Sequence, residues 1–139
     1  MFKHATRRTV TETDNILFTA MTHNPAQLHL DEEYMKGTEY GQRLVNSVFT
    51  LGLMVGISVG EHDARHCGGQ SRVGRGVRFP KPVFHGATLR RDRGHRAARG
   101  SQSRPDQGIV TFLHRAYNQR DELVASCKRS GLQRKKPQS

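Results

Sequence analysis

Residues 18–60 read FTAMTHNPAQLHLDEEYMKGTEYGQRLVNSVFTLGLMVGISVG and contain the strongest structural signal in the chain. Within this stretch, residues 44–59 place apolar side chains on every side of a helix, at Leu44, Val45, Val48, Phe49, Leu51, Leu53, Met54, Val55, Ile57 and Val59. Such a helix must be buried in protein or in lipid. A membrane span needs about 20 apolar residues, and this run is shorter and interrupted by polar side chains. The pattern therefore predicts a central helix over residues 44–59, buried in a protein core.

Three glycines, Gly52, Gly56 and Gly60, recur at four-residue intervals along the predicted helix. The same spacing occurs where two membrane helices pack closely against each other. We favour a different interpretation, in which the missing side chains let a sheet approach the helix backbone. The glycines then indicate a sheet packed directly on one apolar helix.

Length and composition allow one small domain over residues 1–132, followed by a basic tail over residues 133–139. The chain has no apolar segment of the signal-peptide type near Met1, and no further candidate for a membrane span. Its two cysteines, Cys67 and Cys127, are too few for a disulfide framework. We therefore expect a protein of the reducing cytoplasm.

The formal net charge of +11 is the most unusual property of the composition. A strongly basic chain can bind nucleic acid, a membrane surface or the phosphates of a ligand. Aromatic residues are not interleaved with the basic ones, and neither a helix-turn-helix nor an RRM pattern is present. We therefore expect neither nucleic acid nor a membrane as the partner.

A short segment contains residue types that bind metals, namely His62, Asp63, His66 and Cys67. Their spacing matches no strong zinc signature, and no second pair of ligands follows. Chance proximity explains the cluster better, so we expect no metal site.

The last third of the chain has the pattern of a β-hairpin. Residues 109–117 are rich in β-forming side chains, residues 118–122 are polar, and residues 123–127 are again mostly apolar. Two such runs on either side of a short polar turn predict a pair of antiparallel strands.

Two segments carry the candidate chemistry: residues 22–29, THNPAQLH, and residues 44–48, LVNSV, at the start of the predicted helix. The first N–H groups of a helix are unpaired and lie at the positive end of its dipole, which suits a buried substrate carbonyl. Both segments resemble the MaoC-like hydratases of the hot-dog fold. The resemblance is closest to the mesaconyl-CoA hydratase (β-methylmalyl-CoA dehydratase) branch.

The resemblance implies an α+β hot-dog fold, in which an antiparallel sheet wraps around the helix at residues 44–59. It also implies a homodimer formed by pairing of the sheets. Compared with the family, residues 1–15 begin one strand into the domain. We therefore expect the N-terminal strand to be missing.

The family motif S/T-G-D-x-N-P-x-H aligns on His29, which places Asn24 at the position of the usual Asp. The resemblance then implies that His29 exchanges protons with the added water by general acid–base catalysis, because its ordinary pKa of about 6.5 suits both roles. Asn24 can orient the water but cannot take a proton. His23 is the neighbouring alternative base.

The resemblance also implies that the Ser47 amide polarises the thioester carbonyl, with Asn46 beside it in the substrate site. The alternative for Ser47 is a structural role, in which its side chain caps the helix. Arg43 and Lys81 are candidates for contacts with the phosphates of coenzyme A. No cofactor is expected, since coenzyme A is part of the substrate.

Residues 61–76 and 91–103 are rich in Gly, Arg and His and nearly free of aliphatic side chains, where the family has strands. One hypothesis is that both are translated out of frame, because suitable codons read from the second base give STTRGTVVANLGWDE and VTEVTALREGRS. The alternative is a disordered basic insertion, which the composition also supports. We favour the frameshift, since an insertion would add length rather than replace strands.

Together these features predict an acyl-CoA hydratase (a lyase) that acts reversibly on a short branched enoyl-CoA such as mesaconyl-CoA. One alternative is an (R)-specific enoyl-CoA hydratase of broader range. From another class, the alternative is a catalytically inactive or non-enzymatic basic binding protein. A thioesterase is less compatible with the Asn24–His29 spacing, which is a hydratase feature.

Overall fold

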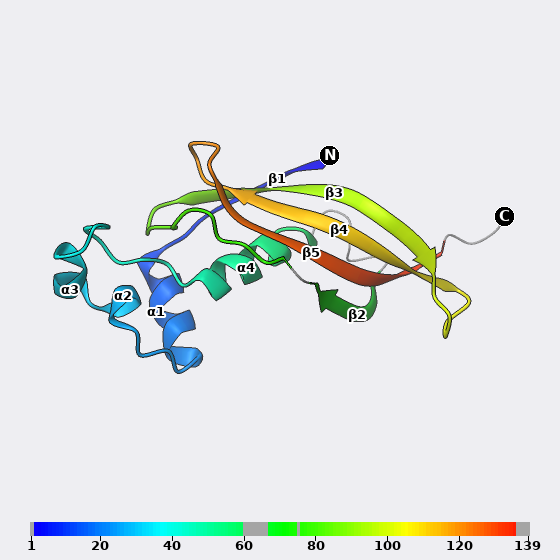
Figure 1. The fold of residues 1–139 in the computed structure, drawn as a ribbon, viewed down its shortest axis with the longest axis horizontal. Coiled ribbons are helices and arrows are strands. Elements are labelled where there is room, and N and C mark those ends of the chain that lie inside the picture. The colour runs from blue at the N-terminus through cyan, green and yellow to red at the C-terminus, as the bar shows by residue number, and fades with distance from the viewer. Residues whose placement is uncertain (1, 60–66, 75, 136–139) are drawn as a thin grey trace.

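The computed structural model describes residues 2–59, 67–74 and 76–135. Its main element is a five-stranded antiparallel sheet with the strand order β1-β3-β4-β5-β2 (Figure 1). The strands are β1 (Phe2–Thr9), β2 (Cys67–Val73), β3 (Thr88–Gly100), β4 (Gln107–Tyr117) and β5 (Leu123–Arg134). The predicted α+β class with an antiparallel sheet is confirmed.

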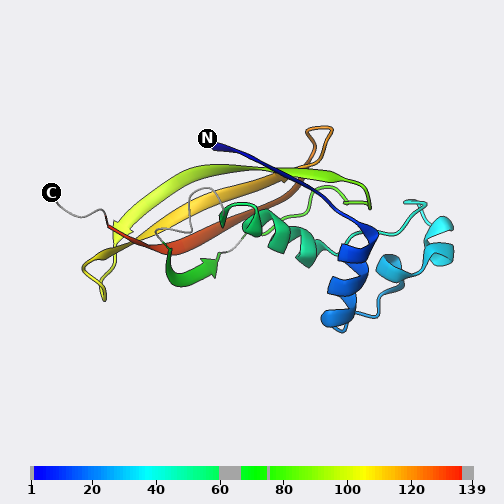
Figure 2. The same cartoon turned by 180° about the vertical axis from the view of Figure 1, so that it is seen from behind.

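In the described part of the chain, four helices accompany the sheet: α1 (Glu12–Met21), α2 (Gln27–Leu30), α3 (Glu32–Lys36) and α4 (Ser47–Gly56). α4 lies along one face of the sheet, and α1, α2 and α3 cluster at one end of it (Figures 1 and 2). The core lies between α4 and the sheet, where Met54 of α4 packs with Leu89 of β3 and Ala125 of β5. Across residues 2–59, 67–74 and 76–135, no helix has the length and apolar composition that crossing a bilayer would take.

The central helix is shorter than the predicted range of residues 44–59. Leu44 forms an isolated antiparallel bridge with Phe84, and the Val45 N–H donates to the Val83 carbonyl at 2.8 Å. Asn46 then caps the helix through its side-chain oxygen, so α4 begins at Ser47. The apolar run therefore begins before the helix, because its first residues pair with a neighbouring extended segment, and it also continues past the end of the helix at Gly56.

The interpretation of the helix glycines is wrong for Gly52 and Gly56. Both are exposed, and a Cβ built on either would meet no atom within 4 Å. The sheet therefore does not approach α4 through these positions. With Val48, which is 59% exposed, they form a side of α4 that this chain does not cover. Gly60 lies outside the described residues.

Two predicted boundaries need correction at the ends of the chain. The prediction of a missing N-terminal strand is wrong, because Phe2–Thr9 forms β1 and pairs with β3. Charged side chains that point to solvent along an edge strand hide its pattern from sequence analysis. The predicted basic tail starts too early, because β5 continues to Arg134 and pairs there with Gln107.

The two segments that lack aliphatic residues contribute strands. β3 includes residues 91–100 and pairs with both β1 and β4, and residues 67–73 form β2. A disordered insertion is therefore wrong for these residues. The strand β3 buries an arginine completely: Arg91 is 0% exposed and contacts the buried His4 and His114. Removing a guanidinium from water is costly, and neither histidine is an anion that could offset its charge.

The predicted β-hairpin of residues 109–127 is confirmed by the pairing of β4 with β5. At its turn, the Glu122 carboxylate accepts hydrogen bonds from Lys81 at 2.6 Å, from Asn118 at 2.7 Å and from Arg120 at 3.3 Å. The Lys81 ammonium, followed by Asn118 and Arg120, lowers the pKa of Glu122 to about 2. The folded state thus holds this carboxyl ionised far more strongly than the unfolded chain does.

We expect this turn to contribute to acid sensitivity. Because the folded-state pKa of Glu122 is lowered, its contribution to stability is present above the ordinary value of 4.5 and is lost as the pH falls toward about 2. Glu122→Gln should therefore lower the melting temperature at about pH 6 and much less at about pH 2.5. Glu33→Gln, on α3, is the matched control for removal of one surface carboxylate. An equal shift at both pH values would contradict the prediction.

Candidate active site

A pocket of about 70 Å³ lies where α2, the start of α4 and the segment of residues 79–83 meet. It brings together three of the predicted site residues, His29, Ser47 and Lys81. The remaining walls are mostly apolar: Leu28, Leu44, Val45, Thr50, Phe79, Pro82, Val83 and Val124. Such a volume holds a few water molecules but is far below the roughly 300 Å³ of a pocket for a drug-sized ligand. The pocket suits water and the reacting atoms of a substrate, not a whole large ligand.

His29 is held in one orientation on the short helix α2. It is 8% exposed, and its Nδ1 lies 2.8 Å from the Leu44 carbonyl oxygen. A carbonyl only accepts, so Nδ1 carries the proton and donates it in this contact. In the neutral ring Nε2 is then the atom with a free lone pair. His29 is therefore positioned as a base that acts through Nε2.

The N-terminus of α4 offers one unpaired N–H group to the pocket. Of its first N–H groups, that of Asn46 donates to Asn15 Oδ1 at 2.8 Å, and that of Val48 donates to Asn46 Oδ1 at 3.0 Å. Among the described residues, no acceptor meets the Ser47 N–H. Ser47 also lines the pocket, at the positive end of the helix dipole. A carbonyl oxygen entering here would find a donor already in place.

The alternative role for Ser47 as a helix cap is wrong. The capping side chain is that of Asn46, which is 4% exposed, and Ser47 is the first residue of α4. Asn46 thus supports the start of the helix and does not point into the pocket as a lining residue. Its side chain uses the same hydrogen-bonding pattern that makes Asn a favoured N-cap.

Asn24 lies in the turn between α1 and α2 and is not among the residues that line the pocket. Its Oδ1 accepts a hydrogen bond from the Ala26 N–H at 3.1 Å, which stabilises the turn before α2. His23 precedes it in the left-handed region with φ 52° and is exposed. In this chain, therefore, Asn24 has a structural contact of its own, and only His29 of the predicted polar pair faces the pocket.

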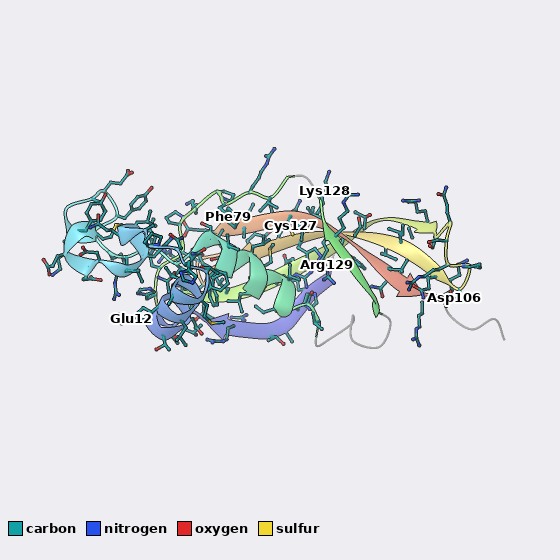
Figure 3. The ribbon with its side chains drawn as sticks, turned by 90° about the horizontal axis from the view of Figure 1, so that it is seen from below. Glu12, Phe79, Asp106, Cys127, Lys128 and Arg129 are labelled. Atoms are coloured by element: carbon teal, nitrogen blue, oxygen red, sulfur yellow. The ribbon has the colours of Figure 1, made fainter. Side chains whose placement is uncertain are left out.

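The two candidate phosphate ligands already have acidic partners. Arg43 pairs with Glu12 of α1, which Figure 3 labels, and its Nε donates to Glu32 at 2.7 Å. The hydrogen bond that Arg43 donates to the Glu12 carboxylate raises the pKa of Arg43 and lowers the pKa of Glu12. Lys81 pairs with Glu122 but is 56% exposed and lines the pocket. Lys81 is therefore the better placed of the two cations for a substrate.

Two residues that were not predicted from the sequence, Asn15 and His85, lie behind the pocket. Asn15 of α1 is 0% exposed and joins His29, Leu44, Asn46 and His85 through hydrogen bonds. Burial, followed by the nearby charge of Arg43, lowers the pKa of His85. The partners of Asn15 lie 14 to 70 positions away along the chain, so no local pattern identifies it.

In the described ranges 2–59, 67–74 and 76–135, no group of His, Cys, Asp and Glu side chains could hold a metal ion. Of the predicted chance cluster, His62, Asp63 and His66 lie outside the described residues, and Cys67 is the first residue of β2.

A model of the family described as MaoC like domain matches residues 1–114. A monoamine oxidase regulatory protein from Archaeoglobus fulgidus is 29% identical, with a TM-score of 0.78 over 95% of this chain and 87% of that one. A MaoC-like dehydratase from Rhodospirillum rubrum is 25% identical, with a TM-score of 0.80 over 99% of this chain and 92% of that one. An (R)-hydratase from A. caviae shares the fold at 19% identity, with a TM-score of 0.73 over 96% and 95% of the two chains. No curated protein matches the chain.

Proposed function

Since this chain belongs to the family of MaoC-like domains, we propose that it is a hydratase that adds water reversibly to a short branched enoyl-CoA such as mesaconyl-CoA. The observation that carries the proposal is the arrangement of His29 and Ser47 on one small pocket. His29 supplies a ring nitrogen with a free lone pair, and Ser47 supplies an N–H donor at a helix N-terminus. Hydration of an unsaturated thioester needs both groups.

In the proposed reaction the thioester carbonyl accepts a hydrogen bond from the Ser47 N–H. Nε2 of His29 takes a proton from water as the water oxygen bonds to the β-carbon, and the electron pair of the C=C bond moves into a thioester enolate. The Ser47 amide stabilises the negative charge on the enolate oxygen. The proton held by His29 then passes to the α-carbon, which restores the base. The reverse sequence removes water.

Asn24 and the two cations have supporting roles in this proposal. Asn24 does not line the pocket and uses its Oδ1 within its own turn, so it would reach the water only through its side-chain NH₂. Lys81, at the rim of the pocket, would contact a phosphate of coenzyme A, and Arg43 would do so at the cost of its contacts with Glu12 and Glu32. Coenzyme A enters as part of the substrate, and no separate cofactor is required.

The size of the pocket supports a short acyl group. A volume of about 70 Å³ with walls such as Leu28, Phe79 and Val124 leaves no room for a long chain. A more open groove of about 380 Å³ lies next to it and shares Leu28 and Leu44 with the pocket. The remainder of a thioester substrate would lie along that groove. We place the reaction in the cytoplasm, in a homodimer.

We also propose that residues 61–76 and 91–103 are read out of frame. Support comes from Arg91, which is fully buried on β3 at a position where the alternative frame has valine. Aliphatic side chains are what a sheet face against an apolar helix requires. The coding DNA tests this directly. A compensating pair of one-base changes around each segment is expected, and an uninterrupted frame would exclude the proposal.

An absorbance assay with mesaconyl-CoA tests the proposed function. Loss of the enoyl-thioester absorbance on addition of the protein is the expected result, with the rate proportional to protein concentration. Crotonyl-CoA, an unbranched enoyl-CoA, is the second substrate. Faster hydration of crotonyl-CoA would favour the broader (R)-specific enzyme. No turnover of either substrate, by a protein that melts cooperatively, would favour the non-enzymatic binding protein.

A further inference from the structure

Asn15 is the most highly connected polar side chain behind the pocket. Its Nδ2 donates to the carbonyls of His29 at 3.2 Å and Leu44 at 3.1 Å, and it lies 3.1 Å from Nε2 of His85. Its Oδ1 accepts from the Asn46 N–H at 2.8 Å. The side chain is 0% exposed, and among residues 2–59, 67–74 and 76–135 these contacts are its hydrogen-bonding environment. A buried amide that satisfies both of its ends is held in one orientation.

Two of these contacts reach the two halves of the proposed site. The Leu44 carbonyl that Asn15 holds is the same carbonyl that accepts the Nδ1 proton of His29. The N–H group that donates to Asn15 Oδ1 belongs to Asn46, the N-cap of α4, one residue before Ser47. A single side chain on α1 therefore touches both the group that selects the His29 tautomer and the turn that presents the Ser47 amide.

The orientation of the Asn15 amide follows from its partners. Carbonyl oxygens only accept and backbone N–H groups only donate, so Nδ2 must face His29 and Leu44 while Oδ1 faces Asn46. Nδ2 has two hydrogens and three acceptors within reach, so its contact with His85 Nε2 shares a hydrogen with one of the carbonyls and requires an unprotonated Nε2. The lowered pKa of His85 agrees with a neutral ring at this position.

We propose that Asn15 is a positioning residue, which sets the tautomer of His29 and the placement of the Ser47 amide through its contacts with Leu44 and Asn46. This inference rests on the proposed hydratase function of the same site. Asn15 itself does not line the pocket, so it acts only through these neighbours. The distances between reacting groups in an enzyme are critical, and small displacements reduce the rate strongly.

Two substitutions separate the functions of the side chain. Asn15→Leu has a similar size and removes the donor and the acceptor together. Asn15→Asp keeps an acceptor for the Asn46 N–H but places a carboxylate oxygen against the carbonyls of His29 and Leu44. Thr19→Val is the matched control, because Thr19 lies one turn further along α1 and is also 0% exposed.

Two measurements are made on the full-length chain and on each variant. Nitrogen NMR of the imidazole rings reports which nitrogen of His29 carries the proton, and this measurement does not depend on turnover. Kinetics on mesaconyl-CoA report kcat and KM separately. Both variants are expected to lower kcat by about 10–100-fold with a much smaller change in KM, and to replace the single Nδ1–H tautomer by a mixture. Thr19→Val should change neither quantity.

The outcomes distinguish this inference from the proposed function. If the unmodified chain hydrates no enoyl-CoA, the proposed function fails, and the tautomer measurement alone decides the role of Asn15. If the chain is active and both Asn15 variants keep kcat and the Nδ1–H tautomer, Asn15 is not a positioning residue. If Asn15→Leu does not fold, Asn15→Asp provides the same two readouts in a side chain of equal size.

Discussion

His29→Ala is expected to lower turnover on mesaconyl-CoA by about 10²–10⁴-fold, the usual effect of losing a general acid–base group. The loss should appear in kcat, because the histidine acts on water and not on the bulk of the substrate. Stability should change little. The Leu44 carbonyl keeps its hydrogen bond from Asn15, so the loss of the His29 contact costs about 1 kcal/mol. Kinetics and thermal melting on the same preparation measure both effects.

His23→Asn is the control for this prediction. His23 is exposed and has a left-handed backbone, which asparagine tolerates well. Its replacement should leave turnover close to that of the unmodified chain. If His29→Ala were active and His23→Asn inactive, His23 would be the base. The alignment of the family motif on His29 would then be wrong.

Ser47→Pro is expected to lower kcat by about 10²–10³-fold, because proline removes the N–H group that stabilises the enolate oxygen. The backbone is well suited to this change. Proline is favoured at the first position of a helix, and Asn46 has φ −57° and ψ 124°, an extended conformation that the residue before proline adopts. The helix should therefore remain intact, which circular dichroism and melting can confirm.

Ser47→Ala separates the amide from the hydroxyl. Alanine keeps the N–H group and removes only the side-chain oxygen, so most of the turnover should remain. A loss in Ser47→Ala equal to that in Ser47→Pro would show that the hydroxyl, not the amide, contacts the substrate. Unchanged kcat in Ser47→Pro would place the oxyanion donor elsewhere.

The sequence predicted the elements whose signals are local. The apolar run of residues 44–59 located the central helix, and the two β-rich runs located the β4–β5 hairpin. The predicted start of the helix was wrong because Leu44 pairs with Phe84, a contact that depends on a segment 40 positions away. The glycines were misinterpreted because a four-residue spacing puts small residues on one side of a helix, and this spacing is the same whether that side faces solvent or a packed neighbour.

The candidate site shows the same division. The alignment on His29 placed one residue of the polar pair in the pocket, and the segment at residues 44–48 correctly located a helix N-terminus there. It did not show that Asn46, and not Ser47, is the cap, since both residue types are good caps. Asn15 was missed because a buried polar residue on a helix is recognised only by its distant partners.

The side chain of Asn15, which joins α1 to the start of α4 by hydrogen bonds, affects the order in which parts of the protein open on heating. The sheet holds its strands by long ladders between β3, β4 and β5, whereas Asn15 connects α1 to the start of α4 by individual hydrogen bonds. Regions joined by few bonds open locally at lower free energy than the global unfolding of the sheet. Opening of α1 would remove the Asn15 hydrogen bonds to the Leu44 carbonyl and the Asn46 N–H in one step. Heating should therefore inactivate the protein before the sheet unfolds, with the amide protons at the start of α4 exchanging ahead of those in β4.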